Sequence, residues 1–159
     1  MKTLILGLGN ELFGDDAVGI HVVYRLRELL EQEPKACTFI ENTDLLECSL
    51  TGLRILDVIE GYDRVILIDT IKKEKPKTGT ISILRGQDLR HIPGPSPHYV
   101  SIPQALEIGR QSGIKVPDRI DIIAVEAKDL YRMGEDLTQE MVDAIPEIIQ
   151  ELKVLLEDT

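Results

Sequence analysis

Three almost continuous apolar runs constrain the fold of this chain more than any other feature of its sequence. They cover Thr3–Leu8, Arg64–Asp69 and Arg119–Val125. Runs of this kind are typical of strands that are buried on both faces, as in parallel sheets. Two shorter segments, Thr38–Glu41 and Thr80–Leu84, are predicted to be further strands, and the alternating pattern of the second indicates an edge strand.

Helical patterns separate these strands. Apolar residues recur every three or four positions, which predicts helices over Asp16–Leu30, Leu50–Ile59, Ser101–Gln111 and from Thr138 onward. Asp15 or Asp16 is expected to cap the first helix or to supply a negative charge in its first turn. Thr138 is expected to cap the last helix, which Pro146 should kink or split at a cost of about 3 kcal/mol. Strands that alternate with helices predict one α/β domain over residues 1–159, with a mostly parallel sheet covered on both faces.

Composition narrows the classes of function. The chain has 28 acidic and 18 basic residues, a net charge of −10, which argues against a nucleic-acid partner. No apolar run approaches the roughly 20 residues of a membrane helix, so no membrane insertion is expected. The N-terminus lacks the pattern of a signal peptide, and the two cysteines lack zinc-ribbon spacing. These features predict a cytoplasmic protein.

Familiar cofactor motifs are absent from the sequence. The segment Gly7-Leu8-Gly9-Asn10-Glu11-Leu12 begins like a dinucleotide fingerprint, but Leu12 stands where the third glycine is required. The sequence also has no Walker loop, no Gly-Xaa-Ser-Xaa-Gly elbow and no His-Glu-Xaa-Xaa-His helix.

Polar residues follow the predicted buried strands, where open α/β sheets bind their ligands. These residues are Asn10–Asp16 after the first run, Asp69 at the end of the second run, and Glu126 after the third. Together with His98, which lies in a proline-rich loop, Asp16 and Asp69 offer two carboxylates and an imidazole to a divalent metal such as nickel, zinc or manganese. Each also has a structural alternative: a helix cap for Asp16, a strand-end cap for Asp69 and a surface position for His98.

At these residues the sequence resembles the hydrogenase maturation endopeptidases. The resemblance is carried by Gly7–Gly19 (GLGNELFGDDAVG), Val65–Asp69 (VILID), Ser96-Pro97-His98 and Gly134–Thr138 (GEDLT). It extends over essentially the whole chain, and the first of these segments is the most specific.

The resemblance implies a phosphorylase/hydrolase-like α/β/α sandwich and an aspartic-type endopeptidase. Such an enzyme removes a C-terminal extension from the large-subunit precursor of a nickel–iron hydrogenase after nickel insertion. By motif position, Asp16, Asp69 and His98 are the implied metal ligands and catalytic residues. The implied metal is the nickel already held by the precursor, so no permanent cofactor is expected.

One segment departs from the family pattern. Many members carry an Asp-Gly-Gly-Thr-like loop after the second strand, whereas this chain has the stretch Glu41–Gly52. Either Asp44 or Glu41 stands in for the family aspartate, and the sequence leaves both alternatives open.

Two mechanisms fit these residues. Nickel could polarise the scissile carbonyl or activate a water, or a carboxylate could act as general base while the metal positions the scissile bond.

Two other functions would use the same residues. One is a nickel-sensing chaperone that docks on the precursor without cutting it, and the other is another hydrolase on a similar sheet, such as an esterase or peptidyl-tRNA hydrolase.

Overall fold

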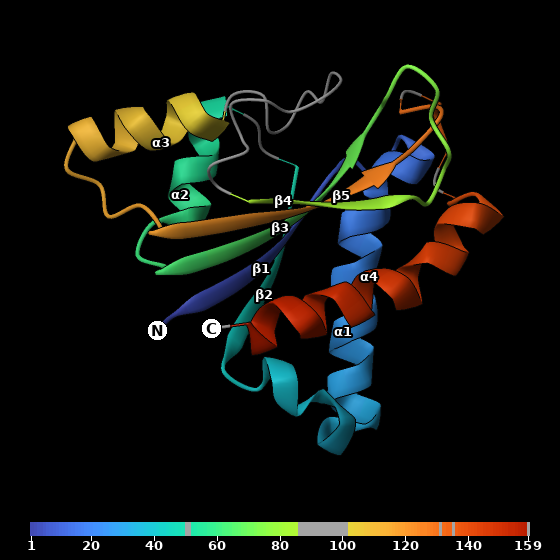
Figure 1. The fold of residues 1–159 in the computed structure, drawn as a ribbon, viewed down its shortest axis with the longest axis horizontal. Coiled ribbons are helices and arrows are strands. Elements are labelled where there is room, and N and C mark those ends of the chain that lie inside the picture. The colour runs from blue at the N-terminus through green and yellow to red at the C-terminus, as the bar shows by residue number, and fades with distance from the viewer. Residues whose placement is uncertain (50–51, 86–101, 131, 135, 159) are drawn as a thin grey trace.

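The computed structural model describes residues 1–49, 52–85, 102–130, 132–134 and 136–158, with the backbone alone at residue 103. Its strands form one five-stranded sheet in the order β2-β1-β3-β5-β4 (Figure 1). The strands are β1 (Thr3–Leu8), β2 (Thr43–Cys48), β3 (Arg64–Ile71), β4 (Ile81–Arg85) and β5 (Arg119–Glu126). All neighbouring pairs are parallel except β4 and β5, which are antiparallel.

Helices cover both faces of this sheet. The α-helices are α1 (Val18–Gln32), α2 (Leu56–Ile59), α3 (Ile102–Gln111) and α4 (Gln139–Glu157), and the 3₁₀ turns are η1 (Gly14–Ala17), η2 (Pro34–Ile40) and η3 (Gly52–Ile55). Figure 1 shows α1 and α4 on one face and α2 and α3 on the other. The predicted three-layer α/β/α sandwich with a mostly parallel sheet is therefore confirmed. In the described part of the chain, no helix is long and apolar enough to cross a membrane.

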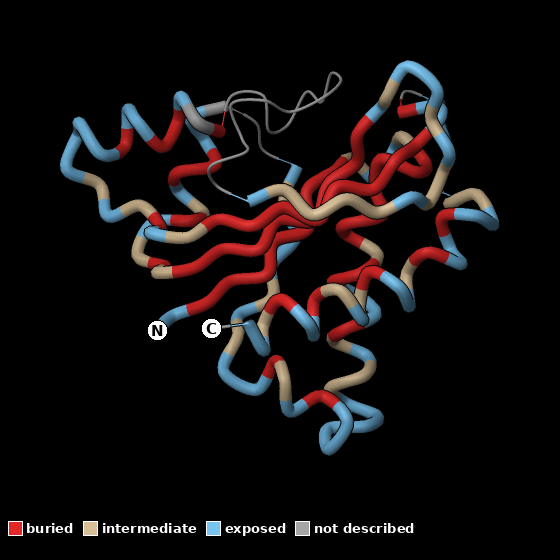
Figure 2. The backbone as a smooth tube through the Cα atoms, viewed as in Figure 1, coloured by how far each residue is buried: buried red, intermediate tan, exposed pale blue. Residues whose placement is uncertain are grey.

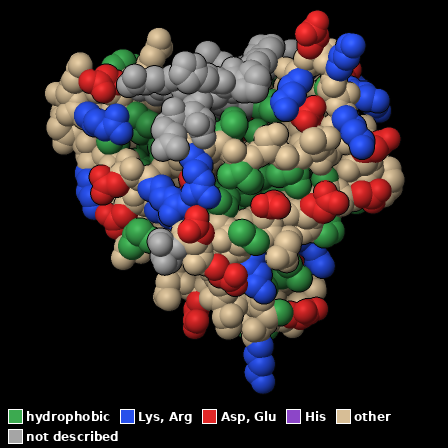
Figure 3. Space-filling view, in the orientation of Figure 1, with side chains coloured by type: hydrophobic (Ala, Val, Ile, Leu, Met, Phe, Trp, Pro, Cys, Tyr) green, Lys and Arg blue, Asp and Glu red, His purple; other side chains and the backbone are tan. Residues whose placement is uncertain are grey.

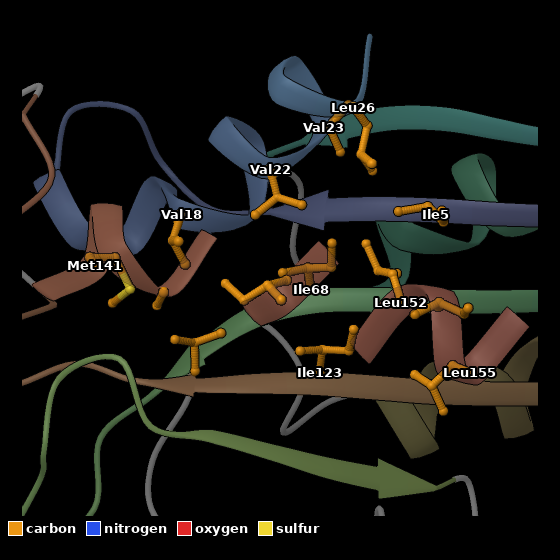
Figure 4. Close-up of a cluster of buried hydrophobic side chains, with 14 of the residues drawn as sticks. Ile5, Val18, Val22, Val23, Leu26, Ile68, Ile123, Met141, Leu152 and Leu155 are labelled. Carbon is orange, nitrogen blue, oxygen red and sulfur yellow. The ribbon is translucent and has the colours of Figure 1, made fainter. Parts of the chain in front are cut away.

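Two apolar clusters fill the spaces between the layers, because successive strand residues point to opposite faces. Ile5, Ile68 and Ile123 pack against α1 and α4, as Figure 4 shows for the larger cluster. Leu6 and Leu67 face the other way and pack against α2 and α3. Figure 2 shows the consequence, a central sheet that is buried along β1, β3 and β5.

The second strand lies later in the chain than the sequence predicts. Thr38–Glu41 was expected to be a strand, but Pro34 begins the 3₁₀ turn η2, which continues to Ile40. The strand is instead Thr43–Cys48, whose residues are half-buried or exposed. As an edge strand it lacks the continuous apolar run that made the central strands recognisable.

The helix ends also differ in part from the prediction. Neither Asp15 nor Asp16 caps α1, because both lie in η1 and Ala17 stands at the N-cap position. Thr138 does cap α4, and its Oγ1 accepts a hydrogen bond from the Met141 amide at 3.4 Å. The prediction that Pro146 could split this helix was wrong, since α4 continues through it. Val142, whose carbonyl loses its amide donor to proline, is exposed, so solvent can supply the missing hydrogen bond.

Glycines let α1 begin in direct contact with the sheet. A Cβ on Gly7 would overlap the carbonyl of Gly19, and a Cβ on Gly19 would overlap the carbonyl of Ile68 in β3. A Cβ on Gly9 would overlap the carbonyl oxygen of Asp16. The backbones of β1, β3 and the η1–α1 segment therefore touch, and this contact determines where Asp16 lies.

A second fixed point lies at the opposite end of the sheet. The side chain of Arg64 is 1% exposed. Its guanidinium donates hydrogen bonds to Asp121 Oδ2 at 3.0 Å and to the Leu155 carbonyl at 2.6 Å. Arg119 donates to the same Asp121 oxygen at 2.9 Å. A buried charge is tolerated only when it is paired, so this cluster holds the last turn of α4 against the starts of β3 and β5.

The candidate residue Asp44 lies at this same end. It is paired in register with Leu4 near the start of β1, and its Oδ2 accepts a hydrogen bond from the hydroxyl of Tyr62 at 2.7 Å. Burial, then this hydrogen bond and the charge of Asp44, raise the pKa of Tyr62 to about 12. Glu41 lies even earlier, before β2 begins.

We predict that replacing Gly19 with alanine lowers the melting temperature. Forcing an extra methyl group into a packed site typically costs about 1–3 kcal/mol, and each kcal/mol corresponds to roughly 2–4 °C in a domain of this size. The comparison is Gly109→Ala in α3, where the added Cβ would meet side-chain atoms of Val116 and Leu56 and no backbone, so a smaller loss is expected. A Gly19→Ala variant that melts like the wild-type protein in a thermal denaturation series would contradict the close contact.

The burial of Tyr62 and its hydrogen bond to Asp44 predict a loss of stability at high pH. Because the pKa of Tyr62 rises to about 12 in the folded protein, from about 10 when unfolded, its contribution is complete below pH 10 and disappears as the pH rises toward 12. The tyrosinate absorbance should therefore show a late-titrating phenol that is missing in Tyr62→Phe. If Tyr62→Phe instead removes a phenol that titrates near pH 10, the hydrogen bond is not formed.

Candidate functional site

The connections of the sheet predict where a ligand would bind. The chain leaves β1 through α1 to reach β2 on one side, and then passes through η3 and α2 on the other face to reach β3 on the other side of β1. In open α/β sheets, ligands bind at the carboxyl ends of the strands where the winding reverses in this way. Here that point lies between the ends of β1 and β3, where Gly7 and Ile68 are paired in register.

Asp16 and Asp69 are connected at this point through one threonine, Thr70. Asp69 immediately follows Ile68, and its Oδ1 accepts a hydrogen bond from the Thr70 amide at 2.8 Å. The Thr70 hydroxyl donates to Asp16 Oδ1 at 2.9 Å, across 54 residues of sequence. Thr70 therefore links two of the three candidate residues: it follows Asp69 in β3, and its hydroxyl contacts Asp16.

Both carboxylates are buried and oriented. Asp16 is 4% exposed and Asp69 is fully buried. The second oxygen of Asp16, Oδ2, accepts a hydrogen bond from the Asn10 amide at 3.0 Å. These hydrogen bonds, one to each carboxylate oxygen, orient Asp16.

The third candidate, His98, lies outside the described residues, as does Ser101, where a helix was expected to begin. Within the described ranges, no group of three or more His, Cys, Asp or Glu side chains is placed to hold a metal ion. The described residues therefore contribute two buried carboxylates, Asp16 and Asp69, at this end of the sheet. Two carboxylates at a ligand-binding position can coordinate a divalent cation or act on a water, and each task needs further groups from a substrate or from other residues.

Asp15 has a different partner from its neighbour. Its two carboxylate oxygens accept hydrogen bonds from the amide and the hydroxyl of Thr138, at 2.7 and 2.9 Å. Asp15 thus attaches the N-terminus of α4 to the loop after β1. This is a structural role, and it explains why two adjacent acids occur here although neither caps α1.

The remaining polar candidates are occupied elsewhere. Glu126 is 5% exposed at the end of β5 and forms an ion pair of 3.6 Å with Lys73. Asp44 and Glu41 lie toward the opposite end of the parallel strands from Asp69, so neither joins the carboxylate pair. His21 is half-buried on α1 beside Tyr24, with ring centroids 6.1 Å apart.

Sequence reasoning missed Thr70 as a site residue. It is 1% exposed inside an otherwise apolar strand, directly after Asp69. A hydroxyl in that position needs a hydrogen-bond partner, and this requirement was a signal available in the sequence segment RVILIDTI.

Comparison with known sequences gives relatives over most of the chain. The hydrogenase 2 maturation protease of Escherichia coli K12 is 29% identical over 132 residues, which cover 82% of this chain and 76% of that protein. The hydrogenase expression/formation protein HupD of Rhizobium leguminosarum bv. viciae is 26% identical over 152 residues, which cover 94% and 71%.

Solved structures share the fold. The hydrogenase maturating endopeptidase HybD from E. coli matches with a TM-score of 0.77 at 25% identity, covering 99% of this chain and 93% of that one. The [NiFe] hydrogenase maturation protease HybD from Thermococcus kodakarensis matches with a TM-score of 0.73 at 23% identity, covering 98% and 99%, and this second likeness concerns the fold alone.

A family model decides the assignment. The model described as hydrogenase maturation protease (HycI) matches residues 20–154, a range that includes Asp69 and His98 and begins just after Asp16. The match covers far more than half of the chain. The chain therefore belongs to the hydrogenase maturation protease family.

Proposed function

We propose that the chain is an endopeptidase that removes the C-terminal extension of a nickel–iron hydrogenase large-subunit precursor after nickel insertion. The observation that carries this proposal is the buried pair Asp16 and Asp69, joined through Thr70 at the ligand-binding end of the sheet in a member of the hydrogenase maturation protease family. The two free cysteines, of which Cys37 is buried, are compatible with action in the reducing cytoplasm.

The nickel is proposed to arrive with the precursor as part of the substrate. Asp16 and Asp69 supply oxygen donors, and His98 completes the set by the motif resemblance. Three protein donors leave coordination positions open for groups of the precursor. The donor set lacks thiolate, which suits a temporary contact with a metal that the precursor already binds.

Catalysis then requires a water near the scissile bond. In one route, the nickel polarises the scissile carbonyl or activates the water. In the other, one of the two carboxylates accepts a proton from the water, and the nickel only positions the scissile peptide bond beside it. The hydrogen bonds from Asn10 and Thr70 to Asp16, and from the Thr70 amide to Asp69, hold both carboxylates in place for either route.

We predict that the purified chain shortens nickel-loaded precursor and leaves nickel-free precursor intact. The reason is that three protein donors leave coordination positions open for groups of the precursor, so productive docking needs the metal of the substrate. The mass of the large subunit before and after incubation measures cleavage. Equal cutting of both forms would contradict recognition of the nickel, and a stable complex without cutting would favour a chaperone.

A second prediction concerns Thr70. Thr70→Val removes the hydroxyl that donates to Asp16 at nearly constant volume, so a buried carboxylate oxygen loses a partner at a cost of about 1–3 kcal/mol. Cleavage of nickel-loaded precursor should fall by about fivefold to a hundredfold if that cost is felt in the transition state, because a tenfold loss corresponds to about 1.4 kcal/mol. Thr70→Ser keeps the hydroxyl and should restore cleavage. If the valine and serine variants cleave alike, the hydrogen bond does not position Asp16 for the reaction.

A further inference from the structure

The loop that carries Asp16 is paired with a second loop that is distant in sequence. The Gly134 amide donates to the Leu12 carbonyl at 2.9 Å, and the Gly14 amide donates to the Gly134 carbonyl at 2.6 Å. These bonds form a short parallel bridge between Phe13 and Gly134. The bridge makes Leu12 and Met133 neighbours, because each immediately precedes a bridged residue.

Leu12 and Met133 are both large apolar residues that face solvent. They are 59% and 78% exposed. Single exposed apolar residues are ordinary on protein surfaces and need no explanation. These two differ because backbone hydrogen bonds hold them side by side, and because Leu12 lies only four residues before Asp16 in the same loop.

A cavity of about 550 Å³ adjoins this pair of loops. Gly14, Asp15 and Gly134 contribute to its wall, so it begins one residue from Asp16. The charged residues that line it have both signs: Lys77, Lys128, Arg132, Asp15, Asp129, Asp136 and Glu140. In Figure 3, the upper right part of the molecule, over the loops that follow β3 and β5, likewise carries basic and acidic side chains interspersed.

A wall with charged residues of both signs suits a peptide better than a polyanion. A phosphate or another polyanion would be opposed by the acidic residues of the wall. A peptide offers N–H and C=O groups along its whole length together with side chains of either charge, so it can satisfy both kinds of residue. An apolar side chain of the same peptide can cover the exposed pair.

We propose that Leu12, Met133 and the adjoining cavity form the docking surface for the precursor segment next to the cleaved bond. An apolar side chain of that segment packs on Leu12 and Met133, and the polar chain beyond it enters the cavity. This inference rests on the proposed function, and it names the part of the enzyme that binds the peptide. The position supports the precursor over a second copy of the chain, because a copy seated here would lie over the loop that carries Asp16.

The test compares Leu12→Ser/Met133→Ser with a matched control, Ile108→Ser/Val154→Ser. The control residues are 43% and 50% exposed, and they lie on α3 and near the end of α4. Steady-state cleavage of nickel-loaded precursor should show a KM raised about tenfold or more in the first variant with kcat within about twofold, since loss of uniform binding raises KM alone. The control should match the wild type, and neither variant should change the melting temperature.

Several results would overturn this docking surface. They are an unchanged KM in Leu12→Ser/Met133→Ser, the same rise in the control, or a wild-type dimer that only the first variant makes monomeric in sedimentation. Failure of the proposed function is recognised separately, because the wild-type chain would then not cut the precursor. In that case the Kd of each variant for the uncut precursor replaces KM, and equal values for the first variant and the wild type would likewise contradict the proposal.

Discussion

The site depends on one close contact between backbones. Gly7 and Gly9 of the β1 segment and Gly19 of α1 leave no room for a Cβ, so the turn η1 lies directly against the ends of β1 and β3. This contact places Asp16 within hydrogen-bond distance of Thr70 and hence next to Asp69. A buried carboxylate is costly unless it is paired, and the Asn10 amide and Thr70 hydroxyl supply the hydrogen bonds that Asp16 needs. The glycines in GLGNELFGDDAVG are therefore required by packing, and they position the acid that follows them.

The last helix is attached at both of its ends. At its N-terminus, Asp15 binds the capping residue Thr138, and near its C-terminus Arg64 binds the Leu155 carbonyl. These contacts join α4 to the carboxyl and the amino ends of the central strands, respectively. The adjacent acids Asp15 and Asp16 thus have different roles. Asp15 binds the N-terminus of α4, and Asp16 contacts Thr70 at the end of β3.

Features that arise from local patterns could be predicted from the sequence. The central strands β1, β3 and β5 follow from continuous apolar runs, and the capping role of Thr138 follows from its side-chain chemistry. The placement of Asp16 and Asp69 at neighbouring strand ends follows from the winding rule for parallel sheets. The edge strand β2 was misplaced because its half-exposed residues resemble a loop, and Pro34 turned the expected segment into the 3₁₀ turn η2.

Long-range partners could not be predicted in this way. Nothing local to Asp15 indicates Thr138, which lies 123 residues away, and nothing local to Arg64 indicates Leu155. Asp44 remained an alternative until its register with Leu4 placed it at the opposite end of the sheet. The role of His98 stays a prediction, since it lies outside the described residues.

The most direct test of this account is a paired measurement on Asp69→Asn. The amide retains an oxygen that can accept the hydrogen bond from the Thr70 amide, so the substitution removes the negative charge and keeps that contact. We predict a melting temperature within about 4 °C of the wild type, equivalent to about 1–2 kcal/mol, and no cleavage of nickel-loaded precursor. A variant that melts early and still cleaves the precursor at the wild-type rate would contradict the account, because Asp69 would then serve the fold and not the reaction.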